Sequence, residues 1–370
     1  MSGVKCTDKT EKAARSSKPD GYTAREWARI QTQETAEKKK QLHLLLITVL
    51  LAALTALMVS LVYYFVIRSH DYTLFYPYEN GDPVFSSGSS LPSGDTASAF
   101  AENLCVTSGD TNITAAALGA QSAGVFDLND RQVVYAKDIF TSRSPASITK
   151  VMTALVTLKY GNLDDLVTVT STAADIEYGS SVCDIKEGDT LSLRQLLYGM
   201  MIASGNDAAM MIAEHVGGSV DNFVAMMNEE AAALGAVDTH FMNPHGLTNE
   251  EHYTSVYDIY LIFQEALKYD TFQDIISRKN YYAEYTRADG SSAAMTWEST
   301  NHYFTNEAQA PDNVIVCGGK TGTTDDAGAC LALLAKDRYG NPYISIILHS
   351  ESKDTLYTEM NQLLSLIEES

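Results

Sequence analysis

An uncharged run of 24 residues, Leu44–Ile67, constrains this chain of 370 residues more than any other stretch. Leu, Ala and Val dominate the run, and about 20 apolar residues are enough to cross a bilayer as a helix. Lys38, Lys39 and Lys40 precede it, and lysines beside a span remain on the cytoplasmic side. We therefore expect a single-pass helix in the cell membrane, with the N-terminus cytoplasmic and everything after residue 67 extracytoplasmic.

A cleaved signal peptide is the alternative interpretation of this run. Its apolar region would be only about 7–15 residues long and would lie close to the N-terminus. The one suitable cleavage pattern, Ala97-Ser98-Ala99, lies about 30 residues beyond the run. An uncleaved anchor is the favoured interpretation.

Charge divides the chain into a basic beginning and an acidic remainder. Residues 1–43 carry ten Lys and Arg against six Asp and Glu, a net +4, whereas residues 68–370 carry sixteen against forty-one, a net −25. Nucleic acid is therefore excluded as a partner of the large part, since phosphate binding needs clustered Lys and Arg. We expect a disordered tail at 1–43, the helix at 44–67, a Gly, Ser and Pro-rich linker at 68–118 and a folded domain at 119–370.

Cysteine and histidine usage points to neither disulfide stapling nor metal binding. Five cysteines are few for a disulfide-stapled protein. Cys317 and Cys330 flank a predicted hairpin and could pair, although buried free thiols are favoured. The eight histidines lack the H-x-x-x-H or H-E-x-x-H spacing of a helical metal site, so we expect no metal and no cofactor.

The periodicity of the folded part predicts strands, then helices, then strands and a last helix. This order predicts a mixed α/β (α+β) fold, in which early and late strands share one sheet with a helical region between them. The predicted strands are 123–127, 132–136, 318–323, 330–336 and 343–349, and the predicted helices are 144–158, 193–203, 207–216, 220–234, 256–268 and 354–367.

The helix predicted at 144–158 places a serine beside a lysine. Ser144 is suited to the N-cap and Pro145 to the first helical position. Ser147 then lies in the first turn, at the positive end of the helix dipole, and Lys150 projects from the same face. A lysine without its charge could take the serine proton. The opposite face is an apolar core stripe formed by Ile148, Val151, Met152, Leu155 and Val156.

Two further motifs follow in the chain, and each also has an ordinary interpretation. Ser204-Gly205-Asn206 separates two predicted helices and could point both polar side chains into a cleft, or Asn206 could simply cap the next helix. Lys320-Thr321-Gly322-Thr323 lies in a strand, where Gly322 is typical of close approach by another backbone. A peptide could add along this edge, with Lys320 and Thr321 attracting a carboxylate; alternatively, Lys and Gly only protect the edge.

Taken together, the order S-x-x-K, S-x-N, K-T-G resembles the active-site triplet of penicillin-binding proteins and serine β-lactamases. The surrounding residues resemble the D-alanyl-D-alanine carboxypeptidases over about residues 120–350. The matching stretches are 147–155, 203–209, 243–247, 319–323 and 327–331.

This resemblance implies a β-lactamase/transpeptidase-like domain, in which an antiparallel sheet is flanked by helices and accompanied by an all-helical region. It also implies a role for each residue of the catalytic motifs. Ser147 would be the acylated nucleophile and Lys150 its base. Ser204 and Asn206 would relay the proton and hold the substrate amide.

The resemblance also assigns the K-T-G strand to substrate binding. Lys320 and Thr321 would bind the terminal carboxylate of the substrate, beside Gly322. The backbone N–H groups of Ser147 and Thr323 would form the oxyanion hole.

The function implied is that of a serine D-Ala-D-Ala carboxypeptidase. It would remove the last D-alanine from peptidoglycan stem peptides ending in D-Ala-D-Ala, and β-lactams would inhibit it by acylating Ser147. Alternatives are a β-lactamase or transpeptidase of the same fold, or a sensor of β-lactams or wall fragments that signals through residues 1–43. The E-x-x-L-N pattern that places the deacylating water in class A β-lactamases is absent between Ser204 and Lys320, which argues against rapid antibiotic hydrolysis.

Overall fold

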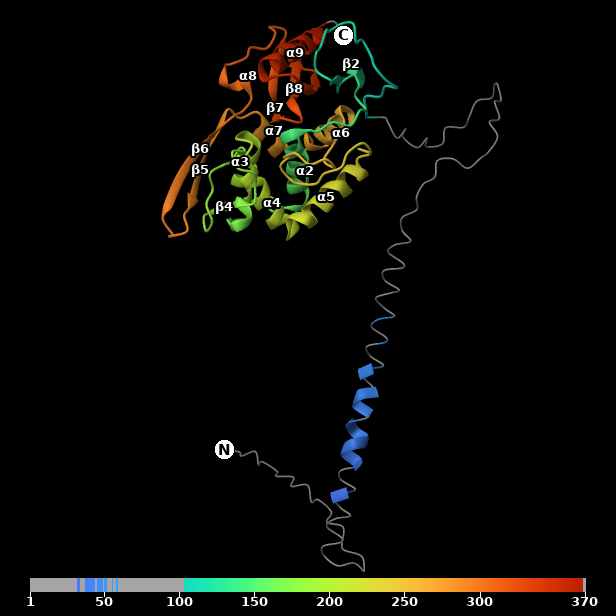
Figure 1. The fold of residues 1–370 in the computed structure, drawn as a ribbon, viewed down its shortest axis with the longest axis vertical. Coiled ribbons are helices and arrows are strands. Elements are labelled where there is room, and N and C mark those ends of the chain that lie inside the picture. Colours follow the sequence, from blue (N-terminus) through green and yellow to red (C-terminus); the bar gives the residue numbers. More distant parts are fainter. Residues whose placement is uncertain are drawn as a thin grey trace, which may run out of the picture. The chain divides into compact units, whose positions relative to one another are not determined.

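A computed structural model describes residues 32–33, 37–43, 45–48, 50–51, 55, 58 and 103–368 (Figure 1). The chain divides into two compact units, Met1–Gly94 and Asp95–Ser370. The described residues of the first unit are helical. No helix among the described residues is long and apolar enough to cross a membrane. Most of the predicted span at 44–67, nearly all of the tail and the linker residues 68–102 lie outside the described residues.

The second unit is built on a five-stranded sheet with the order β2-β1-β9-β8-β7, in which all neighbouring strands are antiparallel. The first strands of the domain therefore pair with the last ones, as the sequence predicts. The strands are β1 Ser122–Asp127, β2 Gln132–Lys137, β7 Val314–Thr324, β8 Gly328–Asp337 and β9 Pro342–Ser350.

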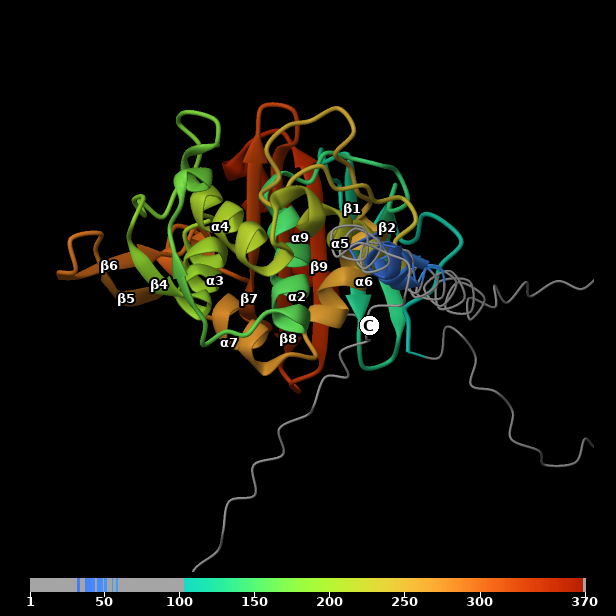
Figure 2. The ribbon, with the colours of Figure 1, turned by 90° about the horizontal axis from the view of Figure 1, so that it is seen from below.

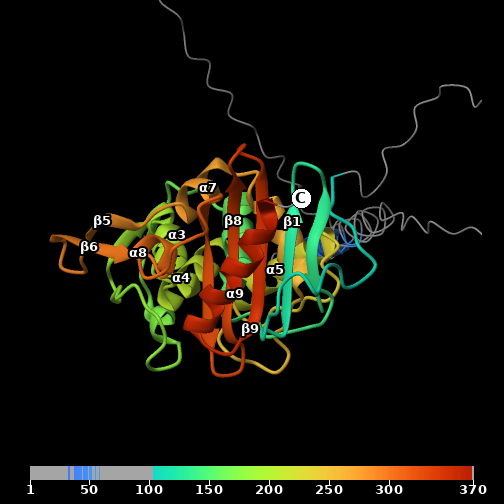
Figure 3. The ribbon, with the colours of Figure 1, turned by 90° about the horizontal axis from the view of Figure 1, so that it is seen from above.

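Helices cover both faces of this sheet, because alternate residues of each strand point to opposite sides. On one face lie α2 (Lys150–Tyr160) and α6 (Val256–Ala266) (Figure 2). On the other, α9 (Lys353–Ser365), followed by the short helix η3 (Leu366–Glu368), lies across β8 and β9 (Figure 3). The sheet thus separates two apolar cores.

The helical region between the early and late strands is present as expected. It comprises α3 (Leu193–Ile202), α4 (Asn206–Gly217), α5 (Val220–Ala233), α6 and the short α7 (Asp270–Ile276). Helix α2 contacts α3, α4, α5 and α6 and is buried from Lys150 to Thr157. Its central position fixes the Ser147 turn within the domain.

A second sheet in the middle of the chain was not predicted from the sequence. Its order is β3-β4-β5-β6, with β3 Leu166–Thr168, β4 Thr190–Ser192, β5 Asn280–Thr286 and β6 Ser292–Glu298. Exposed and less exposed residues alternate along β5 and β6, but only Ala283 and Trp297 are buried, so the two strands lack the apolar runs by which the strands of the large sheet were predicted. The short helices η2 (Ser171–Ala174) and α8 (His302–Thr305) complete the domain.

The predicted start of the serine-bearing helix is wrong in detail. Ser144 is not its N-cap: a 3₁₀ turn, η1 (Ala146–Thr149), begins after Pro145, and the α-helix starts only at Lys150. Ala146 adopts a left-handed backbone with φ of +48°, which a continuous α-helix from residue 145 does not permit. The bend places Ser147 at the end of the helix rather than along its side.

Contacts of the domain extend upstream of residue 119. Cys105 is buried, and its backbone N–H donates to Tyr260 Oη at 2.9 Å while its carbonyl accepts from Tyr257 Oη at 2.9 Å. Thr111 exchanges two backbone hydrogen bonds with Ala136 of β2. Residues 103–118 are therefore tied to the folded domain.

Candidate active site

Ser147 and Lys150 lie in direct contact at the junction of η1 and α2. Lys150 Nζ is 2.9 Å from Ser147 Oγ, 2.7 Å from Asn206 Oδ1 and 2.8 Å from the His245 carbonyl. The Lys150 side chain is fully buried. The structure therefore brings the lysine of S-x-x-K together with both the serine and the asparagine of S-x-N.

These contacts give Lys150 the geometry of a base once it is uncharged. A neutral amine donates two hydrogen bonds and accepts one. The Asn206 Oδ1 and His245 carbonyl oxygens can only accept, so they take the two protons of the amine. Its lone pair then points at the Ser147 hydroxyl.

The surroundings of Lys150 favour the uncharged form. Burial and, to a lesser extent, the nearby Lys320 hold the pKa of Lys150 well below its ordinary value of 10.5. A buried ammonium loses its hydration, and a like charge nearby adds repulsion. The protonated fraction of Lys150 is therefore much smaller than that of a surface lysine.

Lys320 of the K-T-G motif is equally buried and faces Ser204. Its Nζ donates to Ser204 Oγ at 3.0 Å and to the Thr321 carbonyl at 2.8 Å. Burial lowers the pKa of Lys320 to about 7. Ser204 itself has a left-handed backbone with φ of +61°, a strained conformation for a residue with a side chain. The second and third motifs thus meet at the Lys320–Ser204 hydrogen bond.

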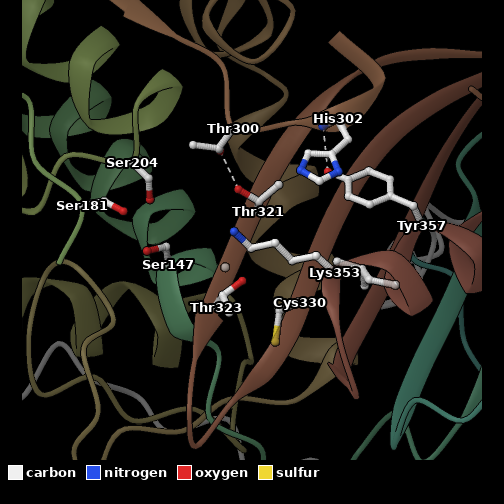
Figure 4. A pocket seen from close by; sticks show the side chains of 12 residues that line it. Ser147, Ser181, Ser204, Thr300, His302, Thr321, Thr323, Cys330, Lys353 and Tyr357 are labelled. Carbon is white, nitrogen blue, oxygen red and sulfur yellow. Dashed lines mark hydrogen bonds between the residues drawn. The ribbon is translucent and has the colours of Figure 1, made fainter. Parts of the chain in front are cut away.

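A cavity opens on Ser147 between α9, η1 and the end of β7 (Figure 4). Ser204, Thr321, Gly322 and Thr323 also line it, whereas Lys150, Asn206 and Lys320 do not. The remaining lining residues are Ser181, Thr300, His302, Cys330, Lys353, Leu356 and Tyr357. A second hollow on the other side of Ser147 is lined by Asn206, Thr323 and the 177–181 segment. Ser147 therefore lies between two open spaces.

Gly322 lets the K-T-G strand approach the serine turn, as predicted. A Cβ atom at Gly322 would lie 2.9 Å from the Ser147 nitrogen and 3.0 Å from the Pro145 carbonyl oxygen. β7 is also an edge strand of its sheet. β7 therefore passes directly beside Ser147, and its other edge has no partner strand in the sheet.

Asp207 was not identified from the sequence, although its carboxylate holds the backbone next to the S-x-N motif. The Asp207 carboxylate accepts backbone N–H groups of Cys183 at 2.7 Å, Ile185 at 3.3 Å and Ala208 at 2.8 Å. The backbone N–H of Asn206 donates to the Ser181 carbonyl at 2.8 Å. Both contacts fix the segment around Ser181 against the S-x-N motif. Asp207 directly follows Asn206 at the start of a predicted helix, and this position is the sequence signal that could have identified it.

Wall residues Thr300, His302 and Lys353 were also missed, because they come from segments without a motif. Thr300 Oγ1 lies 2.6 Å from Thr321 Oγ1, and the His302 ring stacks on Tyr357 with centroids 4.5 Å apart. No sequence spacing relates these residues to Ser147.

The remaining predicted groups are placed as follows. Cys317 and Cys330 are free thiols, with Cys330 buried and Cys317 partly buried. Within the described part of the chain, no three His, Cys, Asp or Glu side chains are grouped so that they could hold a metal ion.

The fold and the motifs together define a class, the serine penicillin-recognising enzymes of mixed α/β architecture. The profile of the D-alanyl-D-alanine carboxypeptidase family matches residues 110–352. The chain belongs to the D-alanyl-D-alanine carboxypeptidase family.

Individual relatives agree with this assignment. The chain is 33% identical to the D-alanyl-D-alanine carboxypeptidase DacF of Bacillus subtilis over 59% of this chain and 54% of that protein. It is 32% identical to a D-alanyl-D-alanine carboxypeptidase of a Streptomyces species over 65% of this chain and 84% of that one. The chain thus spans little more than half the length of the Bacillus relative.

Solved structures show the same fold. A crystal structure of a Streptomyces DD-transpeptidase has a TM-score of 0.64 and 30% identity, covering 69% of this chain and 98% of that one. A D-alanyl-D-alanine carboxypeptidase from Mycobacterium tuberculosis has a TM-score of 0.61 and 28% identity, covering 69% and 92%. The expected transpeptidase-like fold is confirmed.

Proposed function

We propose that this protein is a serine-type D-Ala-D-Ala carboxypeptidase that removes the terminal D-alanine from peptidoglycan stem peptides. The observation that carries the proposal is the contact between Ser147 Oγ and the fully buried Lys150 amine at 2.9 Å, within a family of that activity. β-Lactams would acylate the same serine as inhibitors.

The first step forms an acyl-enzyme. The Ser147 hydroxyl passes its proton to the neutral Lys150 amine, and its oxygen bonds to the carbonyl carbon of the penultimate D-alanine. The N–H groups of Ser147 and Thr323 would receive the developing oxyanion, which such donors stabilise by a few kcal/mol each. Asn206, whose Oδ1 is held by Lys150, would present its amide N–H to the substrate backbone.

The second step expels terminal D-alanine and releases the ester. The C–N bond breaks while a proton reaches the leaving nitrogen, supplied from Lys150 or through Ser204, which is hydrogen-bonded to Lys320. Water then attacks the ester, with its proton going to the same base, and Ser147 recovers its hydroxyl. The products are free D-alanine and a stem peptide one residue shorter.

Labelling with a fluorescent penicillin together with a D-alanine release assay tests this function. Wild type should bind the label covalently and release D-alanine from a D-Ala-D-Ala peptide. Ser147→Ala should do neither, whereas Ser292→Ala, at an exposed position of β6, should behave as wild type. Label retained in Ser147→Ala would contradict the assignment of the nucleophile.

Transpeptidation is the second candidate, favoured by the transpeptidase among the solved structures of similar fold. The same assay, run with an added acceptor amine, separates the two activities. Free D-alanine with an unmodified shortened peptide supports the carboxypeptidase. A product joined to the acceptor in place of water supports the transpeptidase.

We also propose that the chain is anchored in the cell membrane through Leu44–Ile67, with its N-terminus cytoplasmic and the catalytic domain outside. The uncharged run and the three lysines before it support this topology. Fractionation of cells that produce the full chain should place it in the membrane pellet, and protease added to spheroplasts should remove the domain. Release of the full chain with soluble protein would contradict the proposal.

A further inference from the structure

A buried histidine lies behind the Ser147 turn and has no role in the chemistry proposed above. His252 comes from the loop before α6 and is only 3% exposed. Its Nε2 lies 2.8 Å from Thr149 Oγ1, and its Nδ1 lies 3.1 Å from the backbone nitrogen of Met242. The ring of Phe241 packs edge-on against it, with centroids 5.6 Å apart. The imidazole is therefore held at both nitrogens, and it lines neither of the two spaces beside the nucleophile.

These hydrogen bonds define which nitrogen of His252 carries the proton. The Met242 N–H can only donate, so Nδ1 accepts and is unprotonated. Burial, with the nearby His240 and Lys150 as smaller causes, lowers the pKa of His252 to about 4, so the ring is neutral at neutral pH. A neutral imidazole carries a single proton. This proton must lie on Nε2, which therefore donates to the Thr149 hydroxyl.

The Thr149 hydroxyl connects His252 to the peptide bond that precedes the nucleophile. It accepts from His252 Nε2 and donates its own hydrogen to the Ala146 carbonyl at 2.8 Å. That carbonyl and the Ser147 N–H belong to one planar peptide group, so the orientation of one fixes the orientation of the other. Successive hydrogen bonds also polarise one another. His252 is thus linked to the expected oxyanion donor through two hydrogen bonds and one peptide group.

The peptide group needs a restraint because the backbone before it is strained. Ala146 has a left-handed backbone with φ of +48°, a conformation that persists in a residue with a side chain only where the surroundings enforce it. Within the part of the chain that the structure describes, the Ser147 N–H donates no hydrogen bond. The hydrogen-bond restraint therefore comes from the carbonyl side. Release of the Ala146 carbonyl would let the whole group rotate and take the N–H with it.

Building on the proposed function, we infer that His252 is a positioning residue for the nucleophile: through the Thr149 hydroxyl it fixes the Ala146–Ser147 peptide so that its N–H can bind the developing oxyanion. This role has a kinetic signature. An oxyanion donor acts on the transition state more than on the bound ligand. Loss of the His252–Thr149 link therefore lowers the acylation rate constant and leaves ligand binding nearly unchanged.

Acylation of the full chain by a fluorescent penicillin, followed at a series of concentrations, tests this signature. The measurement separates the acylation rate constant from the dissociation constant of the first complex. Thr149→Val removes the hydroxyl at nearly constant volume, and His252→Asn keeps an acceptor for the Met242 N–H but is too short to reach Thr149. Each should lower the rate constant about 10- to 100-fold, with the dissociation constant within about threefold of wild type.

Conservative variants restore the missing atom and exclude a simple packing role. Thr149→Ser keeps the hydroxyl, and His252→Gln places an amide N–H near the position of Nε2. Both should recover most of the acylation rate. The double variant of Thr149→Val and His252→Asn should be about as slow as the slower single variant, because both changes break the same chain of hydrogen bonds.

His240→Asn is the matched control. His240 lies in the same loop, and its Nδ1 donates to the Glu251 carbonyl at 2.7 Å, but it has no hydrogen bond to η1 among the described residues. The control should leave the rate constant and the dissociation constant unchanged. Circular dichroism should show that each variant is folded.

The possible results separate this inference from the proposed function. Unchanged rate constants in Thr149→Val and His252→Asn would overturn the inference, while active wild type left the proposed function standing. Equal losses in His252→Asn and His252→Gln, or effects that multiply in the double variant, would show a packing role and overturn it too.

If His252→Asn does not fold, the comparison of Thr149→Val with Thr149→Ser gives the decision, and equal rate constants in these two variants would overturn the inference. Wild type that does not react with penicillin would overturn the proposed function and this inference with it.

Discussion

Lys150 and Lys320 lie fully buried, and neither forms an ion pair with a carboxylate among the described residues. Uncompensated buried charges are costly, and proteins relieve the cost by shifting the pKa of the group. Here the shift also serves the chemistry, because only the neutral Lys150 amine can take the Ser147 proton. In the proposed mechanism, the site gives up stability to keep a neutral base beside Ser147.

Replacing Lys150 separates these two effects. Lys150→Met keeps most of the length of the side chain but removes the base, so acylation by penicillin should fall by about 10²- to 10⁴-fold, the usual contribution of general base catalysis. Thermal unfolding should show a variant less stable than wild type, because the buried Asn206 Oδ1 and His245 carbonyl lose their donor, a cost that removal of the buried amine only partly offsets. Full acylation in this variant would contradict the role of Lys150 as the base.

Lys320 predicts how stability depends on pH. Its pKa is about 7 in the folded protein and 10.5 as the ordinary value, so the unfolded chain binds more protons between these values. Stability conferred by neutral Lys320 is therefore absent below pH 7 and increases as the pH rises toward 10.5.

Denaturant unfolding of wild type and Lys320→Met at pH 7 and pH 9 measures this contribution. Between the two pH values, wild type should gain on the order of 2 kcal/mol relative to the variant. The comparison with the variant cancels the titration of buried thiols and tyrosines, which both proteins share. An identical change with pH in the two proteins would show that Lys320 keeps an ordinary pKa.

At the scale of elements, the site depends on the close approach of three backbone segments. β7 passes beside η1 at Gly322, and the turn at residues 243–247 contacts η1 at Gly246. A Cβ atom at Gly246 would lie only 1.8 Å from the Ala146 carbonyl oxygen, at a φ of +88°. The same turn supplies the His245 carbonyl that holds Lys150.

Gly246→Ala should therefore destabilise the protein and displace the Ser147 turn. Gly290→Ala is a matched control, since Gly290 has a φ of +82° but nothing within 4 Å of an added Cβ. The control should cost only the left-handed backbone strain, about 1–2 kcal/mol. Gly246→Ala should cost at least about 3 kcal/mol in denaturant unfolding and reduce penicillin labelling. Equal effects of the two substitutions would contradict the clash.

The elements also show what the sequence can predict here. The long helices and the strands of the five-stranded sheet follow from periodicity, because one side of each is deeply buried. β5 and β6 escaped prediction because their residues are mostly exposed, although Asp289-Gly290 between them is a hairpin signal. Lys353 escaped for another reason: it reaches the cavity wall through the path of α9 over the sheet, which no local pattern encodes.

At the scale of the whole molecule, the segment at residues 103–118 joins the domain at several places. It is hydrogen-bonded to Tyr257 and Tyr260 of α6 through Cys105 and to β2 through Thr111. β2 ends the five-stranded sheet, and an unpaired sheet edge invites association with other chains. The segment thus stabilises the domain and covers part of an edge, although its polar composition predicts a linker.

A chain that begins at residue 119, the predicted domain boundary, should therefore be less stable than one that begins at Asp95. Among the contacts it loses are the two tyrosine hydrogen bonds of Cys105 and the two backbone bonds of Thr111, each contributing about 1 kcal/mol. For a domain of this size the melting temperature should fall by on the order of 10 °C. Penicillin labelling at 25 °C should persist, because Ser147 and the residues around it are retained in both chains. Equal melting temperatures would show that the segment adds nothing to the fold and that the domain begins at residue 119.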